Sequence, residues 1–331
     1  MISDPKNRRR SGAPLMIAAV AVAVVVTACS SGAQTPPTAG APPAAAVGRF
    51  ASPQPGSVNS YWLDAPDGLI IVDSGRNVRG GQTIAADILR TGRPVVAILM
   101  THPHPDHVGG LGALLAAFPG TPVYAAQKTV EDIRLDPLHL FPLARQADPD
   151  YPAQVPVPDH PFADGTTLQI GGLAVRTTEY GPGESQTATA YHDDRDNLVF
   201  AGDLVDNHMT PALIEGDLCG WLDNLDGFAH DLPTHTTAYP GHGDPAPADI
   251  LIAAQRTYLT RFRDLVAGAV AADSPGGQTV TAAETADIKA ATDRAYPNYP
   301  PVATLPDLIS VNITAVAKEL SGRPARCGAT T

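Results

Sequence analysis

The chain has 331 residues, of which 44% are hydrophobic and 17% are charged, and its formal net charge is −12. This acidic balance argues against a nucleic-acid-binding protein, which needs a basic surface. Three cysteines are too few for a disulfide-rich scaffold or a four-cysteine zinc cluster, and the scattered hydrophobic residues exclude several membrane spans.

The first residues are predicted to be an export signal. Lys6 and Arg8–Arg10 are basic, and Leu15–Val26 is an apolar run that is short for a membrane span. The following Thr27-Ala28-Cys29 resembles the end of a bacterial lipoprotein signal, in which the cysteine is lipidated and becomes the new N-terminus. The alternative is an ordinary signal peptide or a short anchor helix. We therefore expect an exported protein, lipid-anchored through Cys29 to the outer face of the cytoplasmic membrane or cell envelope.

A tether and one domain are predicted to follow the signal peptide of residues 1–28. Residues 29–46 are rich in Ala and Pro, and such a stretch cannot bury enough apolar surface to fold. No second linker of this length interrupts residues 47–331, so we expect one domain there. Removal of residues 1–28 takes away four basic residues and one acidic residue, which changes the net charge from −12 to −15.

The first half of this domain is predicted to begin with strands. Ser57–Leu63 and Leu69–Asp73 are apolar runs on either side of turn residues, which predicts a hairpin. Gly80–Arg90 is typical of a helix, and the continuous apolar run Val95–Met100 indicates a buried strand. Val108–Phe118 predicts one further helix, which Pro and Gly then end.

The second half is predicted to hold further strands and then helices. Thr121–Ala125 and Asn197–Phe200 indicate strands, and Gly171-Gly172 between two apolar segments predicts a two-residue hairpin turn with positive φ at both positions. Apolar residues repeat at helical spacing in two C-terminal segments. These residues are Leu259, Phe262, Val266 and Val270 in the first segment, and Ile309, Ile313, Val316 and Leu320 in the second. The order of elements favours a mixed α/β domain with helices over sheet faces.

The segment Thr101-His102-Pro103-His104-Pro105-Asp106-His107 follows the predicted buried strand. Imidazole and carboxylate groups are the usual ligands of Zn²⁺. The two prolines are expected to keep the segment extended and out of a helix, so His102 and His104 share a side. The adjacent Asp106 and His107 are expected to diverge, toward a second ion nearby. The alternative is that Asp106 only caps a helix and the histidines form a surface turn.

The pattern His102-x-His104-x-Asp106-His107 resembles the signature of the metallo-β-lactamase fold hydrolases. Three further motifs occur in the order that this family shows. They are Val72-Asp73-Ser74-Gly75, Phe200-Ala201-Gly202-Asp203 and Tyr239-Pro240-Gly241-His242-Gly243. The resemblance covers roughly residues 57–270. It implies a four-layer αββα sandwich with metals at one edge, between the two sheets.

The resemblance implies two divalent metal ions, with zinc expected first. It also implies that Asp73 supports a ligand histidine, although Asp73 could instead be a turn residue. The ligands that it implies are His102, His104 and Glu184 for the first ion, Asp106, His107 and His242 for the second, and Asp203 as the bridge. The six other histidines are expected to be ordinary surface or core residues.

Glu184 departs from the family pattern, which usually has a histidine after the Pro-Gly pair. Glu184 is either a ligand in its own right or the mark of a damaged first site. As a ligand it gives three carboxylates against two divalent ions, so the site has a net charge of +1 instead of +2. This weakens the lowering of the pKa of bound water and shifts metal preference toward Mn²⁺ or Fe²⁺. Glu184→His is therefore expected to lower the pH optimum.

The resemblance implies a metal-dependent hydrolase in which a hydroxide between the ions attacks an ester, lactone, amide or phosphoester, with Asp106 helping to orient it. The alternatives are a sulfur dioxygenase with one iron, or a catalytically silent envelope-binding protein on the same fold. The substrate is expected to be a small molecule, since the charge argues against a nuclease. Leu135–Pro158 is a candidate lid. Cys219 and Cys327 either pair or remain two free thiols.

Overall fold

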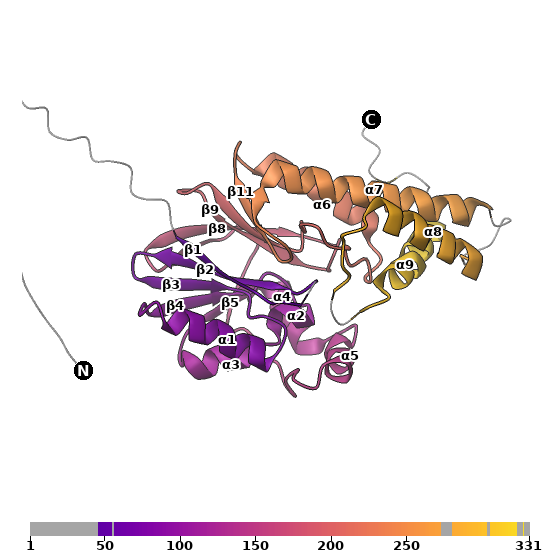
Figure 1. The fold of residues 1–331 in the computed structure, drawn as a ribbon. Helices are drawn as coiled ribbons and strands as arrows, with labels where there is room; N and C mark the ends of the chain where they lie inside the picture. Colours follow the sequence, from indigo (N-terminus) through magenta and orange to yellow (C-terminus); the bar gives the residue numbers. More distant parts are fainter. Residues whose placement is uncertain (1–45, 55, 273–279, 303–304, 323–326, 328–331) are drawn as a thin grey trace, which may run out of the picture. The chain divides into compact units, whose positions relative to one another are not determined.

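Two six-stranded sheets lie face to face, and helices cover their outer surfaces (Figure 1). The computed structural model describes residues 46–331 except 55, 273–279, 303–304, 323–326 and 328–331. The predicted signal peptide, Cys29 and the predicted tether up to residue 45 lie outside the described residues. The layered arrangement confirms the predicted four-layer αββα sandwich.

The first sheet begins with antiparallel strands and continues with parallel ones, which are covered by helices. The β2–β3 hairpin is antiparallel, whereas β3, β4, β5 and β6 run parallel. The strands in spatial order are β1 (Val47–Ala51), β2 (Asn59–Ala65), β3 (Gly68–Val72), β4 (Val95–Leu99), β5 (Val123–Ala126) and β6 (His160–Phe162). The helices of this half are α1 (Val78–Leu89), α2 (Pro105–Val108), α3 (Leu111–Ala117), α4 (Gln127–Leu135) and α5 (Leu140–Ala147).

The second sheet is mostly antiparallel, with one parallel pair between β10 and β11. Its strands are β7 (Thr167–Ile170), β8 (Leu173–Tyr180), β9 (Ala188–Asp193), β10 (Leu198–Gly202), β11 (Thr237–Pro240) and β12 (Ala246–Pro247). The helices of this half are α6 (Leu218–Asp231), α7 (Ala248–Ala272), α8 (Ala282–Ala295) and α9 (Leu308–Gly322).

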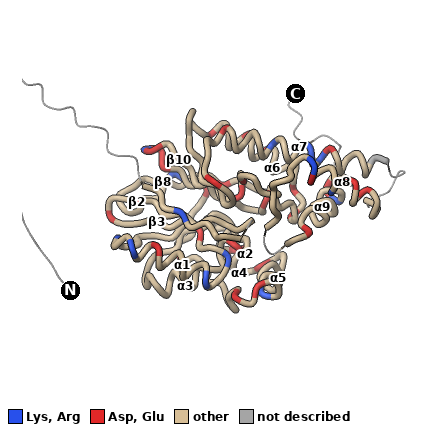
Figure 2. Tube along the Cα trace, in the orientation of Figure 1, with Lys and Arg blue, Asp and Glu red and all other residues tan. Residues whose placement is uncertain are grey.

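Apolar side chains fill the space between the two sheets. Tyr61 and Val72 from the first sheet share one cluster with Val175, Tyr191 and Phe200 from the second. Burial of each such side chain contributes roughly 1.5–3 kcal/mol, so this layer holds the two sheets together. The strands themselves carry few charged residues (Figure 2). The sheet edge at which polar side chains follow the strand ends is therefore held in place by the packing of both sheets.

The structure confirms the predicted hairpin at Gly171-Gly172, where both residues have positive φ. The helix predicted over Val108–Phe118 is present as α3, but it begins later than predicted, at Leu111, because Val108 belongs to the separate short helix α2. The Gly110 N–H donates to the Gly75 carbonyl instead of continuing the first helix. Glycine is a poor helix former, which explains a break at Gly109-Gly110.

The structure bears on two proline-rich segments and corrects the expectation for the first. Pro105 does not exclude a helix, because it occupies the first turn of α2, where its missing N–H is not needed. The candidate lid Leu135–Pro158 contains a helix, α5, which the sequence pattern did not predict.

The C-terminal helices pack on the second sheet and on each other. Ile313 and Val316 of α9 share a core cluster with Trp221 of α6 and Phe262 of α7. A disulfide joins Cys219 and Cys327, whose Cα atoms are 5.1 Å apart, so the two thiols are paired. Among the described residues, no helix is both long and apolar enough to cross a membrane.

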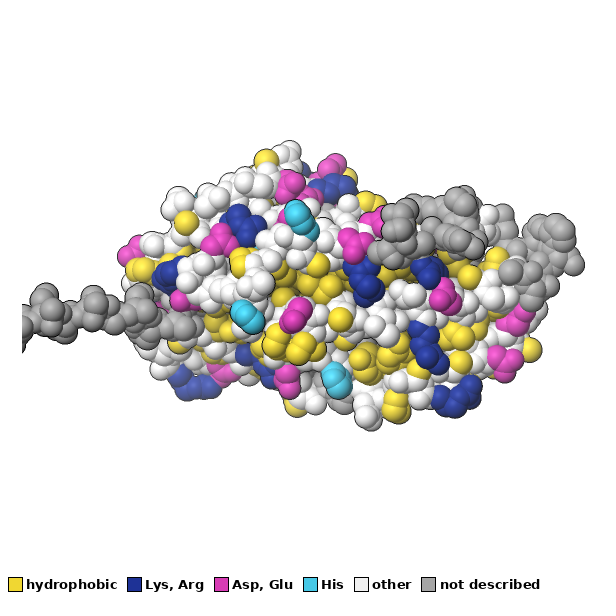
Figure 3. Space-filling view, turned by 90° about the horizontal axis from the view of Figure 1, so that it is seen from above, with side chains coloured by type: hydrophobic (Ala, Val, Ile, Leu, Met, Phe, Trp, Pro, Cys, Tyr) yellow, Lys and Arg dark blue, Asp and Glu magenta, His cyan; other side chains and the backbone are white. Residues whose placement is uncertain are grey.

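The surface carries charges of both signs. In the face drawn in Figure 3, basic and acidic side chains alternate with exposed hydrophobic ones. This face shows no continuous basic area of the kind that nucleic-acid binding requires.

Candidate metal centre

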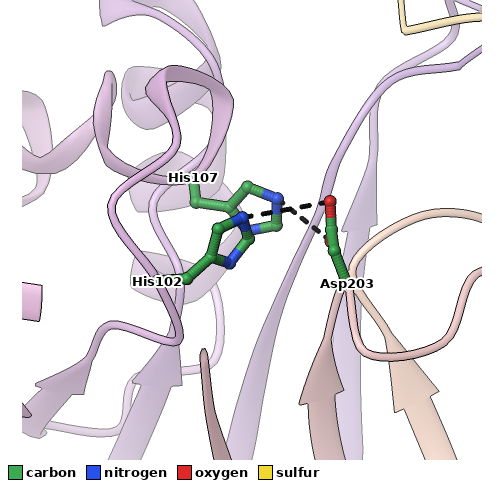
Figure 4. A group of neighbouring side chains, drawn as sticks. All are labelled: His102, His107 and Asp203. Carbon is green, nitrogen blue, oxygen red and sulfur yellow. Dashed lines mark ion pairs between the residues drawn. The ribbon is translucent and has the colours of Figure 1, made fainter. Parts of the chain in front are cut away.

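Polar side chains follow the ends of four strands and meet at one edge of the sandwich. Asp73 comes directly after β3, and the segment that starts at Thr101 comes just after β4. Asp203 follows β10, and His242 lies two residues after β11. Figure 4 shows His102 and His107 on one side and Asp203 on the other, with their polar atoms facing one another. All of these residues are buried.

The first group of potential metal ligands contains His102, His104 and Glu184, whose ligand atoms all lie within 4.8 Å of one another. Glu184 Oε1 is 2.8 Å from His104 Nδ1, and Glu184 Oε2 is 3.6 Å from His102 Nε2. Glu184 therefore lies where the resemblance places the third ligand of the first ion. The expectation that His102 and His104 share a side agrees with this grouping.

The second group contains Asp106, His107 and His242, again within 4.8 Å. Asp106 Oδ2 is 3.4 Å from His242 Nε2. The expectation that Asp106 and His107 diverge is wrong, because both belong to this one group. The first turn of α2 replaces the extended backbone on which that expectation was based.

Asp203 lies between the two groups. Its Oδ1 is 3.2 Å from His107 Nε2, and its Oδ2 is 3.2 Å from His242 Nε2 and 3.9 Å from His102 Nε2 (Figure 4). A Cβ atom at Gly241 would stand 1.8 Å from Asp203 Oδ1, so only glycine fits before His242. Asp203 is thus placed to contact ions held by either group.

Asp73 orients His102 and His107 through the ring nitrogen, Nδ1, that faces away from the ligand groups. It accepts hydrogen bonds from the His107 Nδ1–H at 2.8 Å, the Thr101 hydroxyl at 2.8 Å and the Thr101 amide at 2.9 Å. Because that hydroxyl donates to Asp73, its oxygen accepts from the His102 Nδ1–H at 3.0 Å. Both His102 and His107 thereby present Nε2 toward Asp203. This agrees with the supporting role expected of Asp73.

Glu215 performs the same task for His104 and was not predicted from the sequence. Its Oε1 accepts a hydrogen bond from the His104 Nε2–H at 2.9 Å, which leaves Nδ1 free to face Glu184. Glu215 lies in the loop between β10 and α6, 111 residues after His104. No local motif marks it, so only the fold reveals the contact.

The buried charges stabilise one another. Burial alone would lower the pKa of His107, but Asp203 and Asp73 raise it well above its usual value. Burial favours a neutral Asp203, but His107 and His242 hold its pKa well below the usual range. Burial raises the pKa of Glu184 to about 7, although His104 beside it acts in the opposite direction. Divalent cations would replace the protons that now balance these carboxylates.

The residues present fit such cations. His102 Nε2, His107 Nε2, Asp203 Oδ1 and both oxygens of Glu184 are buried, and among the described residues they have no hydrogen-bond partner. Buried polar atoms without partners are rare and costly, and a bound cation would satisfy all of them at once. Imidazole and carboxylate donors suit Zn²⁺, Mn²⁺ and Fe²⁺.

The six other histidines lie outside these groups. One is buried in β9, and the others are exposed, as expected for ordinary core and surface residues. They are His192 in β9 and, on the surface, His139, His160, His208, His230 and His235.

Comparison with known proteins supports the same interpretation. The family model of the Metallo-beta-lactamase superfamily matches residues 53–251, which is more than half of the chain. A protein named "Probable metallo-hydrolase" from Streptococcus pyogenes is 30% identical over 188 residues, which cover 56% of this chain and 78% of that protein. A hydroxyacylglutathione hydrolase from Bdellovibrio bacteriovorus is 30% identical over 180 residues, which cover 54% of this chain and 60% of that protein.

Solved structures show the same fold. A beta-lactamase domain protein from Burkholderia ambifaria has a TM-score of 0.61 at 19% identity, covering 83% of this chain and 86% of that one. A metallo-beta-lactamase family protein from Thermus thermophilus has a TM-score of 0.60 at 20% identity, covering 81% and 92%. The site, the matched family and the named hydrolase relatives agree. The chain belongs to the metallo-beta-lactamase superfamily and is a metal-dependent hydrolase.

Proposed function

We propose that this hydrolase uses two divalent metal ions to cleave an ester, lactone, amide or phosphoester bond in a small molecule. The observation that carries the proposal is the pair of buried ligand groups with Asp203 between them. His102, His104 and Glu184 would hold one ion, and Asp106, His107 and His242 the other. We expect zinc first, with Mn²⁺ or Fe²⁺ favoured more than usual by Glu184.

The ions, when bound, polarise the substrate oxygen and lower the pKa of water. The protein supplies orientation and a dry environment. Asp73 and Glu215 fix which nitrogen of His107 and His104 faces the centre. Asp106, at the boundary between the centre and the adjoining pocket, is placed to accept a hydrogen bond from the attacking water and so to aim it. The hydrolase names of the relatives support this reaction class over a dioxygenase.

We also propose that the protein is exported and anchored by a lipid on Cys29. The support is the sequence alone, in the basic residues, the apolar run and the small residues before the cysteine. Mass spectrometry of the protein from its native membrane would show a diacylglyceryl group on Cys29. Recovery of the same protein with an unmodified N-terminus at Met1 would refute the proposal.

The metal proposal is tested by elemental analysis of the purified protein, prepared without added metal. We expect two ions per chain, and hydrolysis that is lost with a chelator and restored by the same metal. One iron per chain, or no metal, would contradict the proposal. A panel of ester, lactone, amide and phosphoester substrates would then identify the bond that is cleaved.

A further inference from the structure

A pocket of about 220 Å³ opens beside the candidate metal centre. Asp106, Glu184 and His242 form part of its wall, so a molecule in the pocket would touch the centre directly. Most of the remaining lining is apolar, and it comes from segments that are distant in the sequence. Figure 1 shows two of the contributing helices, α5 and α9, at the same end of the molecule.

Two apolar walls bound this pocket. Leu143 and Ala144 of α5 belong to one wall. Ile214, from the loop after β10, and Val302 and Val311, from the C-terminal segment, belong to the other. Leu143 is 57% exposed, which is far more than a core leucine, so it lies at the mouth of the pocket. These two walls favour alkyl groups.

The pocket offers little to an anion. Apart from histidines, Arg76 is the only cationic side chain among the described lining residues, and its Nε lies 3.4 Å from Asp148 Oδ2. A carboxylate or phosphate on the substrate would have to compete with Asp148 for this arginine. Burial of an unpaired charge among leucine and isoleucine side chains would be strongly unfavourable.

Tyr151 is the tyrosine of the pocket lining. The residue is only 5% exposed and lines the pocket, and its hydroxyl has no hydrogen-bond partner among the described residues. Burial raises the pKa of Tyr151 above its usual value, and the nearby Asp106 acts in the same direction. The hydroxyl therefore keeps its proton. A buried donor without a partner points to a ligand oxygen that completes it.

We propose that the pocket binds a neutral ester or lactone by its apolar acyl chain, and that the Tyr151 hydroxyl donates a hydrogen bond to an oxygen of the scissile group. The choice of ester or lactone rests on the proposed hydrolase function, whereas the preference for an apolar chain rests on the pocket alone. In the reaction, water adds its hydroxyl to the acyl carbon, the acyl C–O bond breaks, and the remaining proton goes to the leaving alkoxide. Tyr151 is a substrate-binding residue in this scheme.

The binding step can be tested without hydrolysis. Methyl butyl, methyl hexyl and methyl octyl ketones carry a carbonyl but no bond that a hydrolase cleaves. In calorimetric titrations of the metal-loaded protein, we expect the affinity to rise about fourfold for each added methylene until the pocket is filled. The methyl hexyl ketone with a carboxylate at the far end of its chain should bind at least about tenfold more weakly. Affinity that does not depend on chain length, or tighter binding of the anionic ketone, would overturn the proposal.

Two pairs of variants distinguish the contribution of the alkyl chain of the ketone from that of its carbonyl group. Leu143→Glu should abolish the gain per methylene, whereas Leu89→Glu, at a 60% exposed leucine of α1 outside the pocket lining, should not. Tyr151→Phe should weaken every ketone by about fivefold and leave the gain per methylene unchanged. Tyr258→Phe removes a hydroxyl that is buried in α7 outside this lining and should have no effect. Equal effects of the two tyrosine variants would refute the role of Tyr151.

Hydrolysis of p-nitrophenyl esters of increasing chain length completes the test. We expect kcat/KM to rise with chain length in parallel with ketone affinity, and to lose this rise in Leu143→Glu. Ketone binding with the expected increment but no ester hydrolysis would refute the choice of ester and leave the apolar site standing. Ester hydrolysis without any dependence on chain length would refute the apolar site and leave the hydrolase standing.

Discussion

The two ligand groups of the metal centre differ in how closely they follow the family pattern. The second group, Asp106, His107 and His242, has the residue types that the resemblance implies. The first group has Glu184 in place of a histidine. It also has a second carboxylate, since Glu215 binds the other side of His104. Each position therefore has one carboxylate among its ligands and one behind a histidine, and the first position differs in having Glu184 where the family pattern has a histidine.

This difference has a physical consequence for metal binding. Compared with a histidine, the Glu184 carboxylate favours harder divalent ions and balances more of their charge. The second position keeps the ligand types of the family pattern, and Asp73 orients its His107. We expect two ions with different affinities and different preferences, held together by Asp203.

Asp203→Asn should have the largest effect, because Asp203 faces histidines of both groups. We expect loss of both ions and a fall in activity of about a thousandfold, since a metal ion contributes several kcal/mol to the transition state. Elemental analysis and steady-state kinetics would measure this. Asp193→Asn, at a buried carboxylate at the end of β9, is the control and should keep both ions. Loss of only one ion in Asp203→Asn would show that the two positions are independent.

Glu184→Ala should remove one ion and leave the other. His242→Ala, in the second group, should instead remove the second ion, so the two variants distinguish the two metal positions. We expect each to hold one ion per chain and to lose about a hundredfold in activity, because one Lewis acid is gone. Glu184→His should restore two ions. Two ions per chain in Glu184→Ala would show that Glu184 is not a ligand.

Glu215→Gln and Asp73→Asn should lower metal affinity by less than loss of a ligand does, and each should act most strongly at a different position. Each changes the group that orients a ligand histidine, which typically costs 10–100-fold in metal affinity. Titration with a competing chelator should show weaker binding of the first ion alone in Glu215→Gln. Asp73→Asn should weaken the second ion most, because His107 bonds to Asp73 directly, whereas His102 of the first group does so only through Thr101. If Glu215→Gln weakens the second ion instead, the division into two positions is wrong. Circular dichroism would confirm that both variants fold.

Metal identity should show the smallest difference. With Zn²⁺ and Mn²⁺ supplied together, we expect the protein to retain several-fold more Mn²⁺ relative to Zn²⁺ than Glu184→His does, because carboxylate oxygen suits the harder ion. Mass spectrometry of the intact metal-loaded protein would measure the ratio. An identical ratio in the two proteins would mean that Glu184 does not tune the metal.

The central part of the site could be predicted because its residues follow strand ends in short motifs. Four of the candidate ligands lie within one stretch of six residues, His102–His107. His242 stands between two glycines, Gly241 and Gly243, a pattern typical of a turn. The fold could be predicted from the same motifs together with the alternation of strands and helices. The exact bounds of the helices could not be predicted, since a helix begins at Pro105, which was expected to keep its segment extended.

The rest of the site depends on contacts that no local pattern encodes. Glu215 meets His104 across 111 residues, and nothing in its immediate sequence distinguishes it from a surface glutamate. Tyr151 and Val302, which are 151 residues apart in the sequence, line one pocket. Such pairs are brought together by the packing of layers, so their proximity becomes visible only in three dimensions.

The shared family region ends at residue 251, yet Val302, Leu305 and Val311 line the pocket. One wall of the pocket therefore comes largely from residues beyond the matched region, and the disulfide between Cys219 and Cys327 fastens that part of the chain to α6. All of the candidate metal ligands, by contrast, lie before residue 251. Substitutions at Val302, Leu305 and Val311 would therefore reshape the pocket and leave every candidate ligand in place.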